Sequence, residues 1–200
     1  SDGTGEPELL VKSGAYPIMT PDGTRVIYGA QASPGNHDIM EMSLDGSQRV
    51  RGLVQTPFED GGAVISPDGH WLAYQSTFSG RREVYVGPYP NTASRRWPVS
   101  TAGGSDARWR PDGRELFYVA PDGSLMGVQM KSTGSTWDAT APVKLLEPGY
   151  WSRPLIGAAY DVSPDGKRFL IVTPPKDTGP PDIVVVQHWD QELKALVPSK

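Results

Sequence analysis

One four-residue phrase recurs four times along the chain and constrains its fold more than any other feature. The copies are Thr20-Pro21-Asp22-Gly23, Ser66-Pro67-Asp68-Gly69, Arg110-Pro111-Asp112-Gly113 and Ser163-Pro164-Asp165-Gly166. Their prolines lie 46, 44 and 53 residues apart. A period of about 45 residues is typical of propellers and solenoids, in which each repeat is one supersecondary unit. The spacing therefore predicts a repeat protein.

The phrase itself has the chemistry of a tight turn between two strands. Proline fixes φ near the value of the first turn position, the aspartate side chain accepts hydrogen bonds from nearby backbone N–H groups, and glycine accepts a positive φ. Apolar, strand-like residues stand on both sides of every copy, so each copy predicts a β-hairpin. One structural role thus explains all eight acidic and glycine positions: Asp22, Asp68, Asp112, Asp165, Gly23, Gly69, Gly113 and Gly166.

The strand pattern continues after each hairpin. Third and fourth strands follow in the first three repeats, which predicts units over residues 15–55, 61–101 and 105–147. The last unit, residues 158–189, lacks a fourth strand, and residues 8–11 at the other end of the chain are predicted to supply it. Residues 190–196 are predicted to form one short helix, since Asp190 is a good N-cap and apolar residues follow at helical spacing.

The hairpins and the third strands that begin Asp38-Ile39-Met40 and Asp182-Ile183-Val184 resemble the WD-like β-propeller repeats of TolB-type proteins. The resemblance spans roughly residues 8 to 189 and implies an all-β propeller of four four-stranded blades in one domain, residues 1–200. Three readings stay open: a ring closed by residues 8–11, which we favour, half of a dimeric eight-bladed ring, or a fragment of a larger ring.

The end of the chain, from Val184 to Lys194, also resembles the C-terminus of bacterial multidomain proteins that carry a propeller beside a kinase-like domain. No kinase motif is present in this sequence, so no kinase activity is expected. The resemblance implies a bacterial protein and favours a periplasmic or other extracytoplasmic location. It gives no specific function, because propellers support many unrelated activities.

Composition narrows the classes of partner. The net charge is −4 without a block of lysine and arginine, which disfavours nucleic acid and anionic membranes. No run of about 18 apolar residues is present, so no membrane insertion is expected. Glycine (23) and proline (20) are frequent, as many tight turns require, and the absence of cysteine excludes disulfides and thiol chemistry. A homodimer is compatible with all of this.

The sequence contains no recognised catalytic, metal-binding or cofactor-binding motif. His37, His70 and His188 fall in three different repeats, which predicts surface or packing roles for them. We therefore expect no cofactor and no resident metal. The favoured function is a non-catalytic module that recognises a protein or peptide. The alternative is a hydrolase or lactonase acting on a small molecule or glycan through carboxylates at the channel mouth.

The loops that enter the first strand of each unit reach one rim of a propeller's channel. The longest of them contains Tyr150, Trp151 and Arg153, whose residue types anchor many interfaces. Together with Glu59, Asp60, Asp106 and Arg108 they form the predicted binding surface. Trp71 and Trp109 are predicted to pack between blades, whereas Trp137 lies in an irregular stretch and is a further binding candidate.

Overall fold

The computed structural model describes residues 9–131, 136–148 and 160–171 of the 200-residue chain. The first sheet contains β1 (Ala15–Met19), β2 (Arg25–Ser33), β3 (Asn36–Ser43) and β4 (Val50–Val54). The second contains β5 (Asp60–Ile65), β6 (Trp71–Ser76), β7 (Glu83–Pro88) and β8 (Trp97–Pro98), with the short 3-10 helix η1 (Thr92–Ser94) before β8. The third contains β9 (Ser105–Trp109), β10 (Glu115–Val119), β11 (Leu125–Gln129) and β12 (Val143–Leu146), and β13 (Tyr160–Val162) pairs with β14 (Phe169–Ile171).

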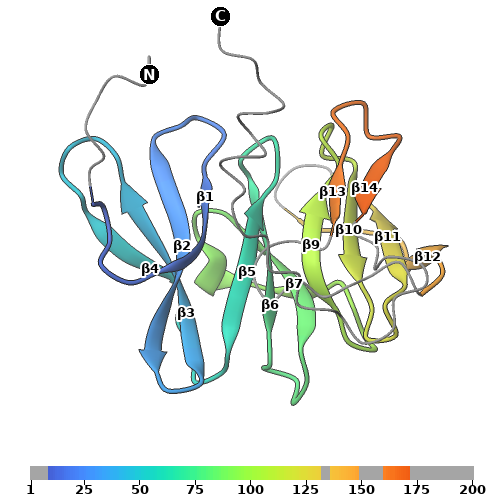
Figure 1. Cartoon of the computed structure of the whole chain (residues 1–200), viewed down its shortest axis with the longest axis horizontal. Coiled ribbons are helices and arrows are strands. Elements are labelled where there is room, and N and C mark those ends of the chain that lie inside the picture. The colour runs from blue at the N-terminus through green and yellow to red at the C-terminus, as the bar shows by residue number, and fades with distance from the viewer. Residues whose placement is uncertain (1–8, 132–135, 149–159, 172–200) are drawn as a thin grey trace, which may run out of the picture.

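Each sheet is an antiparallel meander whose strands pair in chain order. The sheets follow one another across the molecule from β1 to β12, as in part of a propeller (Figure 1). The first strands are the inner ones, because β5 contacts β1 of the preceding sheet and β9 contacts both β5 and β13. The predicted all-β fold and the predicted four-stranded units are confirmed for the first three repeats, and the first hairpin of the fourth repeat is confirmed as well.

The four Pro-Asp-Gly turns lie together along one edge of the molecule, the upper edge of Figure 1. In the second turn Ser66 Oγ donates to Asp68 Oδ1 at 2.5 Å, and the same oxygen accepts the His70 N–H at 3.0 Å. The Trp71 N–H donates in turn to Ser66 Oγ at 2.9 Å. Equivalent hydrogen bonds to the aspartate are made in the turns of Asp22, Asp112 and Asp165. The predicted structural role of these aspartates is confirmed.

A β-bulge recurs at one position of the inner strand in the three complete sheets. The register of β1 with β2, of β5 with β6 and of β9 with β10 shifts there. The residue at the bulge has positive φ in every case: 51° at Tyr16, 56° at Gly62 and 54° at Asp106. The bulge lets the inner strand continue past an irregular residue. Asp60 and Asp106 therefore lie within β5 and β9 and not in the loops that enter these strands, where the sequence pattern had indicated them.

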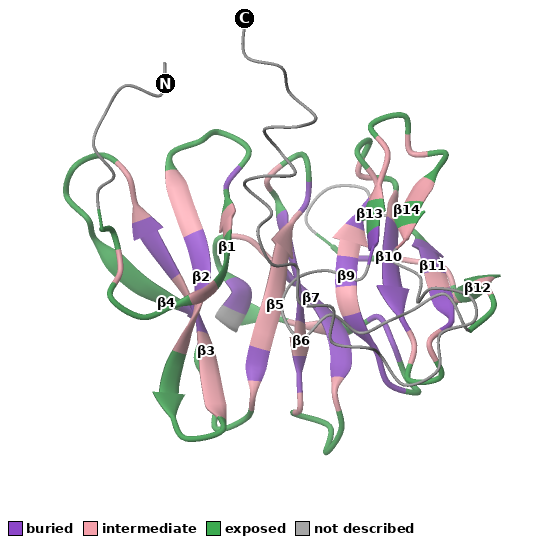
Figure 2. Cartoon of the chain, in the orientation of Figure 1, coloured by how far each residue is buried: buried purple, intermediate pink, exposed green. Residues whose placement is uncertain are grey.

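The hydrophobic core lies between sheets rather than within one. Alternate residues of β6 face opposite neighbours: Leu72 and Tyr74 pack with Ile27 and Ile39 of the first sheet, whereas Trp71 packs with residues of the third. This is the alternation that the pleat of a strand imposes. Figure 2 shows the buried residues concentrated in the middle of each sheet, with the connecting turns exposed.

The predicted closing strand and the terminal helix are not shown. Leu9, Leu10 and Val11 form no strand, and residues 182–186 and 190–196 lie outside the described part of the chain. Among the described residues, no helix is long and apolar enough to cross a membrane.

Candidate functional site

The predicted surface residues divide into three groups. Tyr150, Trp151 and Arg153 lie outside the described residues. Glu59 and Asp60 lie where β5 begins, at the end of the sheet opposite the Pro-Asp-Gly turns, and Asp106 and Arg108 lie in β9. Both pairs are described, and no hydrogen bond or ion pair joins one pair to the other. Asp60 is buried where β5 begins, whereas Asp106 lies at the bulge of β9, so the two carboxylates have different surroundings.

Asp60 is buried rather than displayed. The residue is only 1% exposed. Its Oδ2 accepts a hydrogen bond from Thr56 Oγ1 at 2.6 Å. Burial raises the pKa of Asp60 above its ordinary value, although the hydroxyls of Ser76 and Thr56 act in the opposite direction. The charge of Asp38 raises this pKa further, and that of Arg96 lowers it. Our prediction that Asp60 contacts a partner directly was wrong, because the bulged inner strand turns the side chain inward.

The buried Asp60 instead organises two loops that lie side by side. Thr56 Oγ1, which donates to Asp60, also accepts the Phe58 N–H at 3.2 Å. In the β6–β7 loop, Thr77 Oγ1 accepts the Glu59 N–H at 3.0 Å, and the Thr77 N–H donates to the Glu59 carbonyl at 3.1 Å. Ser76 Oγ accepts the Phe78 N–H at 3.2 Å. These bonds fix the positions of two phenylalanines that sequence reasoning missed.

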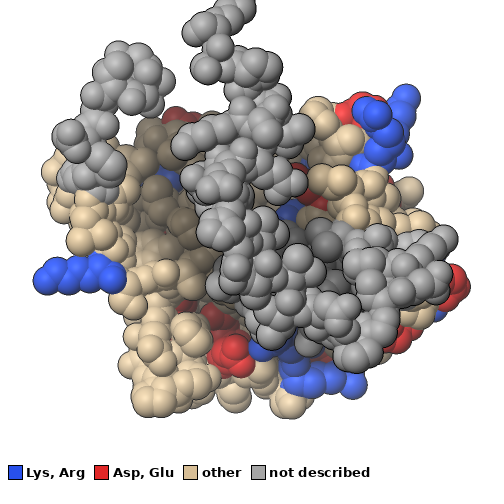
Figure 3. Space-filling view, in the orientation of Figure 1, with Lys and Arg blue, Asp and Glu red and all other residues tan. Residues whose placement is uncertain are grey.

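Phe58 and Phe78 form an exposed aromatic pair. Their ring centroids are 5.3 Å apart at an interplanar angle of 88°, and the residues are 36% and 44% exposed. The guanidinium carbon of Arg96 lies 3.5 Å from the centroid of the Phe78 ring, and Arg82 pairs with Glu59 at 3.2 Å. We call Phe58, Phe78, Glu59, Arg82 and Arg96 the rim cluster. Acidic and basic side chains meet at the lower edge of Figure 3, where the β4–β5 and β6–β7 loops of Figure 1 lie.

Asp106 and Arg108 belong to a separate place on the inner strand. Ser105 Oγ donates to Asp106 Oδ2 at 2.9 Å, and Arg108 Nη1 donates to the Ala107 carbonyl at 2.8 Å. Both charges act on the buried Tyr160 of β13. Burial raises the pKa of Tyr160 well above its ordinary value, Arg108 lowers it, and Asp106 raises it. These two residues therefore lie near the contact between the third and fourth repeats.

The tryptophans are mostly core residues. Trp71 and Trp109 are buried, as predicted. Trp137 is only 7% exposed, and its ring meets those of Trp71 and Trp109 edge to face with centroids 5.7 and 5.9 Å away. Trp137, a binding candidate from the sequence, therefore packs into the core, because residues 139 and 140 return to pair with the end of β11 and carry this side chain inward.

No group of three or more histidine or acidic side chains among the described residues is arranged to hold a metal ion. Two buried carboxylates, Glu41 and Glu83, are held by several hydrogen bonds within the fold and have structural roles. Glu41 accepts hydrogen bonds from Arg25, Arg51 and Tyr89, and Glu83 is held by Arg81 and the Gly103 N–H.

The repeated sheets and their inner strands define part of a β-propeller of the TolB-like kind. No protein-family model and no curated protein sequence matches the chain. Solved propellers do match: TolB from Acinetobacter baumannii has a TM-score of 0.62 at 19% identity, over 89% of this chain and 42% of that one. An oligogalacturonate lyase in complex with manganese has a TM-score of 0.61 at 18% identity, over 85% of this chain and 48% of that one.

A puromycin-hydrolyzing peptidase from Mycobacterium tuberculosis has a TM-score of 0.59 at 21% identity, over 76% of this chain and 27% of that one. At these identities the similarity establishes the fold alone. The chain spans less than half the length of each of these three proteins. The three proteins include a peptidase and a lyase as well as TolB, so the comparison supports no single activity.

Proposed function

We propose that this chain is a non-catalytic recognition module that binds a protein or peptide at the rim cluster. The observation that carries the proposal is the exposed Phe58–Phe78 pair, held in place from below by hydrogen bonds to Thr56 and Ser76. Aromatic residues and arginine are enriched in protein interfaces, because the rings offer a large apolar contact area and arginine adds a charge. Both are present here.

The rim cluster favours a partner segment that offers an apolar side chain beside a carboxylate. The two phenyl rings supply the apolar contact. Arg96 stacks on Phe78, and a cation that is already ordered over a ring loses less side-chain freedom when it binds an anion. Arg82 is paired with Glu59 at an exposed position and can exchange that pair for a partner's carboxylate at small cost. Tyr150, Trp151 and Arg153 remain a predicted extension of this surface.

The proposal is tested with peptides selected from a random displayed library against the purified chain. Changing both Phe58 and Phe78 to serine is expected to abolish binding of the selected peptides while the thermal midpoint changes little, since both rings are exposed. The matched control changes two other exposed apolar residues, Val143 and Leu170, to serine. Peptides that bind the Phe58 and Phe78 variant as well as the wild type would show that the recognition surface lies elsewhere. The variant with both Trp151 and Arg153 changed to alanine tests the predicted extension.

The enzymatic alternative stays a prediction that none of the described contacts favours. Glu59 is ion-paired, Asp60 is buried, and neither bonds to Asp106. A screen of hydrolase and lactonase substrates with added calcium would support it only if turnover is found and Asp106→Asn abolishes it.

We also propose that the ring closes through residues 8–11, which would pair with residues 182–186 and complete a fourth blade. The fourth repeat's hairpin, β13 and β14, supports this reading, and closure would cover the edge strands of the sheet. The chain has no cysteine, so a variant with both Val11→Cys and Val185→Cys would contain just the two introduced thiols. A disulfide that forms within one chain under mild oxidation supports closure. A disulfide that forms between chains supports the dimeric ring. If no disulfide forms, the result supports a fragment of a larger ring.

A further inference from the structure

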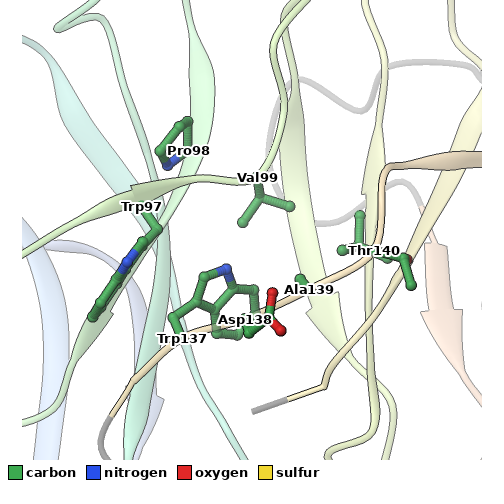
Figure 4. Close-up of a pocket in the computed structure, with 8 residues that line it drawn as sticks. Trp97, Pro98, Val99, Trp137, Asp138, Ala139 and Thr140 are labelled. Atoms are coloured by element: carbon green, nitrogen blue, oxygen red, sulfur yellow. The ribbon is translucent and has the colours of Figure 1, made fainter.

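A concave site lies between the outer edge of the second sheet and the third sheet, and none of the rim cluster residues lines it. It is a cavity of about 230 Å³ that opens to solvent (Figure 4). Its walls come from β8 and the residue after it, from β11, and from the segment that returns to pair with the end of β11. The lining residues are Trp97, Pro98, Val99, Val128, Trp137, Asp138, Ala139 and Thr140.

The walls of this cavity are held rigidly. Trp137 is buried and packs edge to face on two other indoles, and Trp97 meets Trp71 in the same way at 5.7 Å. The returning segment is tied to the third sheet, because the Thr140 N–H donates to the Gln129 carbonyl at 3.0 Å and Thr140 Oγ1 accepts the Gln129 N–H at 3.1 Å. A cavity with fixed walls loses little conformational freedom when a ligand enters.

The cavity combines aromatic walls with one negative charge. Asp138 is exposed, and its carboxylate makes no ion pair or side-chain hydrogen bond to any residue in the described part of the chain. In Figure 4 this carboxylate lies beside the Trp137 ring and below Val99. Trp97 already attracts a cation of the chain, since the Arg95 guanidinium carbon lies 5.0 Å from its ring centroid. Arg95 does not line the cavity.

We infer that this cavity binds a small organic cation of the methylated-ammonium type. The indole rings of Trp97 and Trp137 line the cavity beside the carboxylate of Asp138, and both kinds of group favour positive charge. Val99, Val128 and Pro98 offer no acceptors through their side chains, and Asp138 and Thr140 supply acceptors from one wall alone, so a primary ammonium would recover only part of the hydration it loses there. A methylated ammonium has an apolar surface and a diffuse charge, and it fits both kinds of wall. A free compound and a methylated lysine side chain share this chemistry.

The experiment is a titration of the whole chain with tetramethylammonium chloride at constant ionic strength, followed through the indole N–H resonances of Trp97 and Trp137. We expect saturable shifts of both resonances. We expect binding about fivefold tighter than that of tert-butyl alcohol, a neutral molecule of similar shape. Equal affinity for the cation and the neutral molecule, or no saturable shift, would overturn the inference.

A variant separates the carboxylate from general electrostatics. Asp138→Asn is expected to weaken tetramethylammonium binding about fivefold, whereas Glu147→Gln, which removes an exposed carboxylate elsewhere in the same repeat, leaves it unchanged. Both residues are exposed, so the fold is not at risk. Unaltered binding by the Asp138 variant, or an equal loss in both variants, contradicts the inference. A peptide containing trimethyllysine, compared with free choline, then shows which source of the cation binds more tightly.

Discussion

At the scale of single residues, the Pro-Asp-Gly turns differ in one informative way. In the second turn Asp68 accepts the Ser66 hydroxyl and the His70 N–H, whereas Asp112 in the third turn accepts the Arg114 N–H and faces the Arg110 side chain at 3.4 Å. Burial raises the pKa of Asp68, but the hydrogen bonds from Ser66 and His70 outweigh it, and the net pKa is lowered.

We therefore predict that Asp68→Ala lowers the free energy of unfolding by about 1 kcal/mol and that Asp112→Ala lowers it by about half as much. The hydroxyl bond that Asp68 receives has no counterpart at Asp112, where an exposed ion pair contributes little. Urea unfolding followed by circular dichroism measures both changes. An equal or larger loss at Asp112 would contradict the assignment of the extra stability to the serine hydroxyl.

A second residue-scale prediction concerns Asp60. Burial raises its pKa in the folded chain above the ordinary 3.8, so the folded state binds this proton more tightly than the unfolded state. Its contribution to stability is complete below about pH 4 and is lost as pH rises through the folded pKa. Asp60→Asn cannot lose a proton. The unfolding free energy of the wild type minus that of the variant is therefore expected to fall as pH rises above about 4.

The charge of Asp38 raises the pKa of Asp60, so Asp38→Asn is the matched background for this measurement. The same decline is expected in that background, because burial is the largest cause of the shift. A difference that stays constant, or rises with pH, would show that Asp60 is not protonated preferentially in the fold.

Residue-scale errors of the sequence reading have a common cause. Local turn chemistry identified Asp68 correctly, since its partners lie within two residues. Asp60 and Trp137 were misplaced because a bulge and a returning segment, both set by pairing with other strands, decide which way they point. Phe58 and Phe78 were missed because their partnership joins two different loops. An aromatic residue in a loop was the available signal, but it was applied only to Trp137, Tyr150 and Trp151.

At the scale of elements, one buried carboxylate ties the first sheet to the second. Glu41 of β3 is 3% exposed, and its oxygens accept from Arg25 Nη1 at 3.0 Å, Arg51 Nε at 3.0 Å and Tyr89 Oη at 2.7 Å. Tyr89 follows β7, so the cluster spans two sheets. Burial together with the Glu41 charge raises the pKa of Tyr89 to about 12. The tyrosine therefore remains a hydrogen-bond donor throughout the neutral range.

Glu41→Ala is predicted to lower the free energy of unfolding by about 2 kcal/mol, because it leaves two partly exposed guanidinium groups and the half-buried Tyr89 hydroxyl without their acceptor. Glu59→Ala, which breaks an exposed pair with Arg82, is the control and is expected to cost less than about 1 kcal/mol. Chemical denaturation monitored by tryptophan fluorescence measures both. Similar small losses would mean that the Glu41 cluster adds no net stability over solvated charges.

The strands themselves were largely predictable, and the reason is physical. Each first hairpin depends on residues adjacent in sequence, and β2, β6 and β10 begin within two or three residues of their turns. The extent of β5 and β9 was not predictable, because the bulges at Gly62 and Asp106 depend on pairing partners. Ring closure depends on contacts between distant ends of the chain, and the sequence left three alternatives for it.

At the scale of the whole molecule, no complete sheet has a core of its own. Successive residues of β10 face different neighbours: Leu116 packs with residues of the second sheet, and Phe117 packs with Tyr160 and Phe169 of the fourth repeat. The ring centroids of Phe117 and Phe169 are 4.9 Å apart. In such an arrangement, stability depends on the interfaces between neighbouring repeats, as in other repeat proteins.

This predicts that two adjacent substitutions in one strand loosen opposite parts of the molecule. Leu116→Ala and Phe117→Ala are each expected to cost about 3 kcal/mol, since both side chains are buried. Amide hydrogen exchange should then rise most in β6 for the Leu116 variant and in β14 for the Phe117 variant, because each loses one interface and keeps the other. Increases confined to β9–β12 in both variants would instead show that the third sheet is stable by itself. A core built between sheets predicts that exchange rises in β6 for one variant and in β14 for the other. The same core holds the rim cluster and the Trp97–Trp137 cavity at fixed positions.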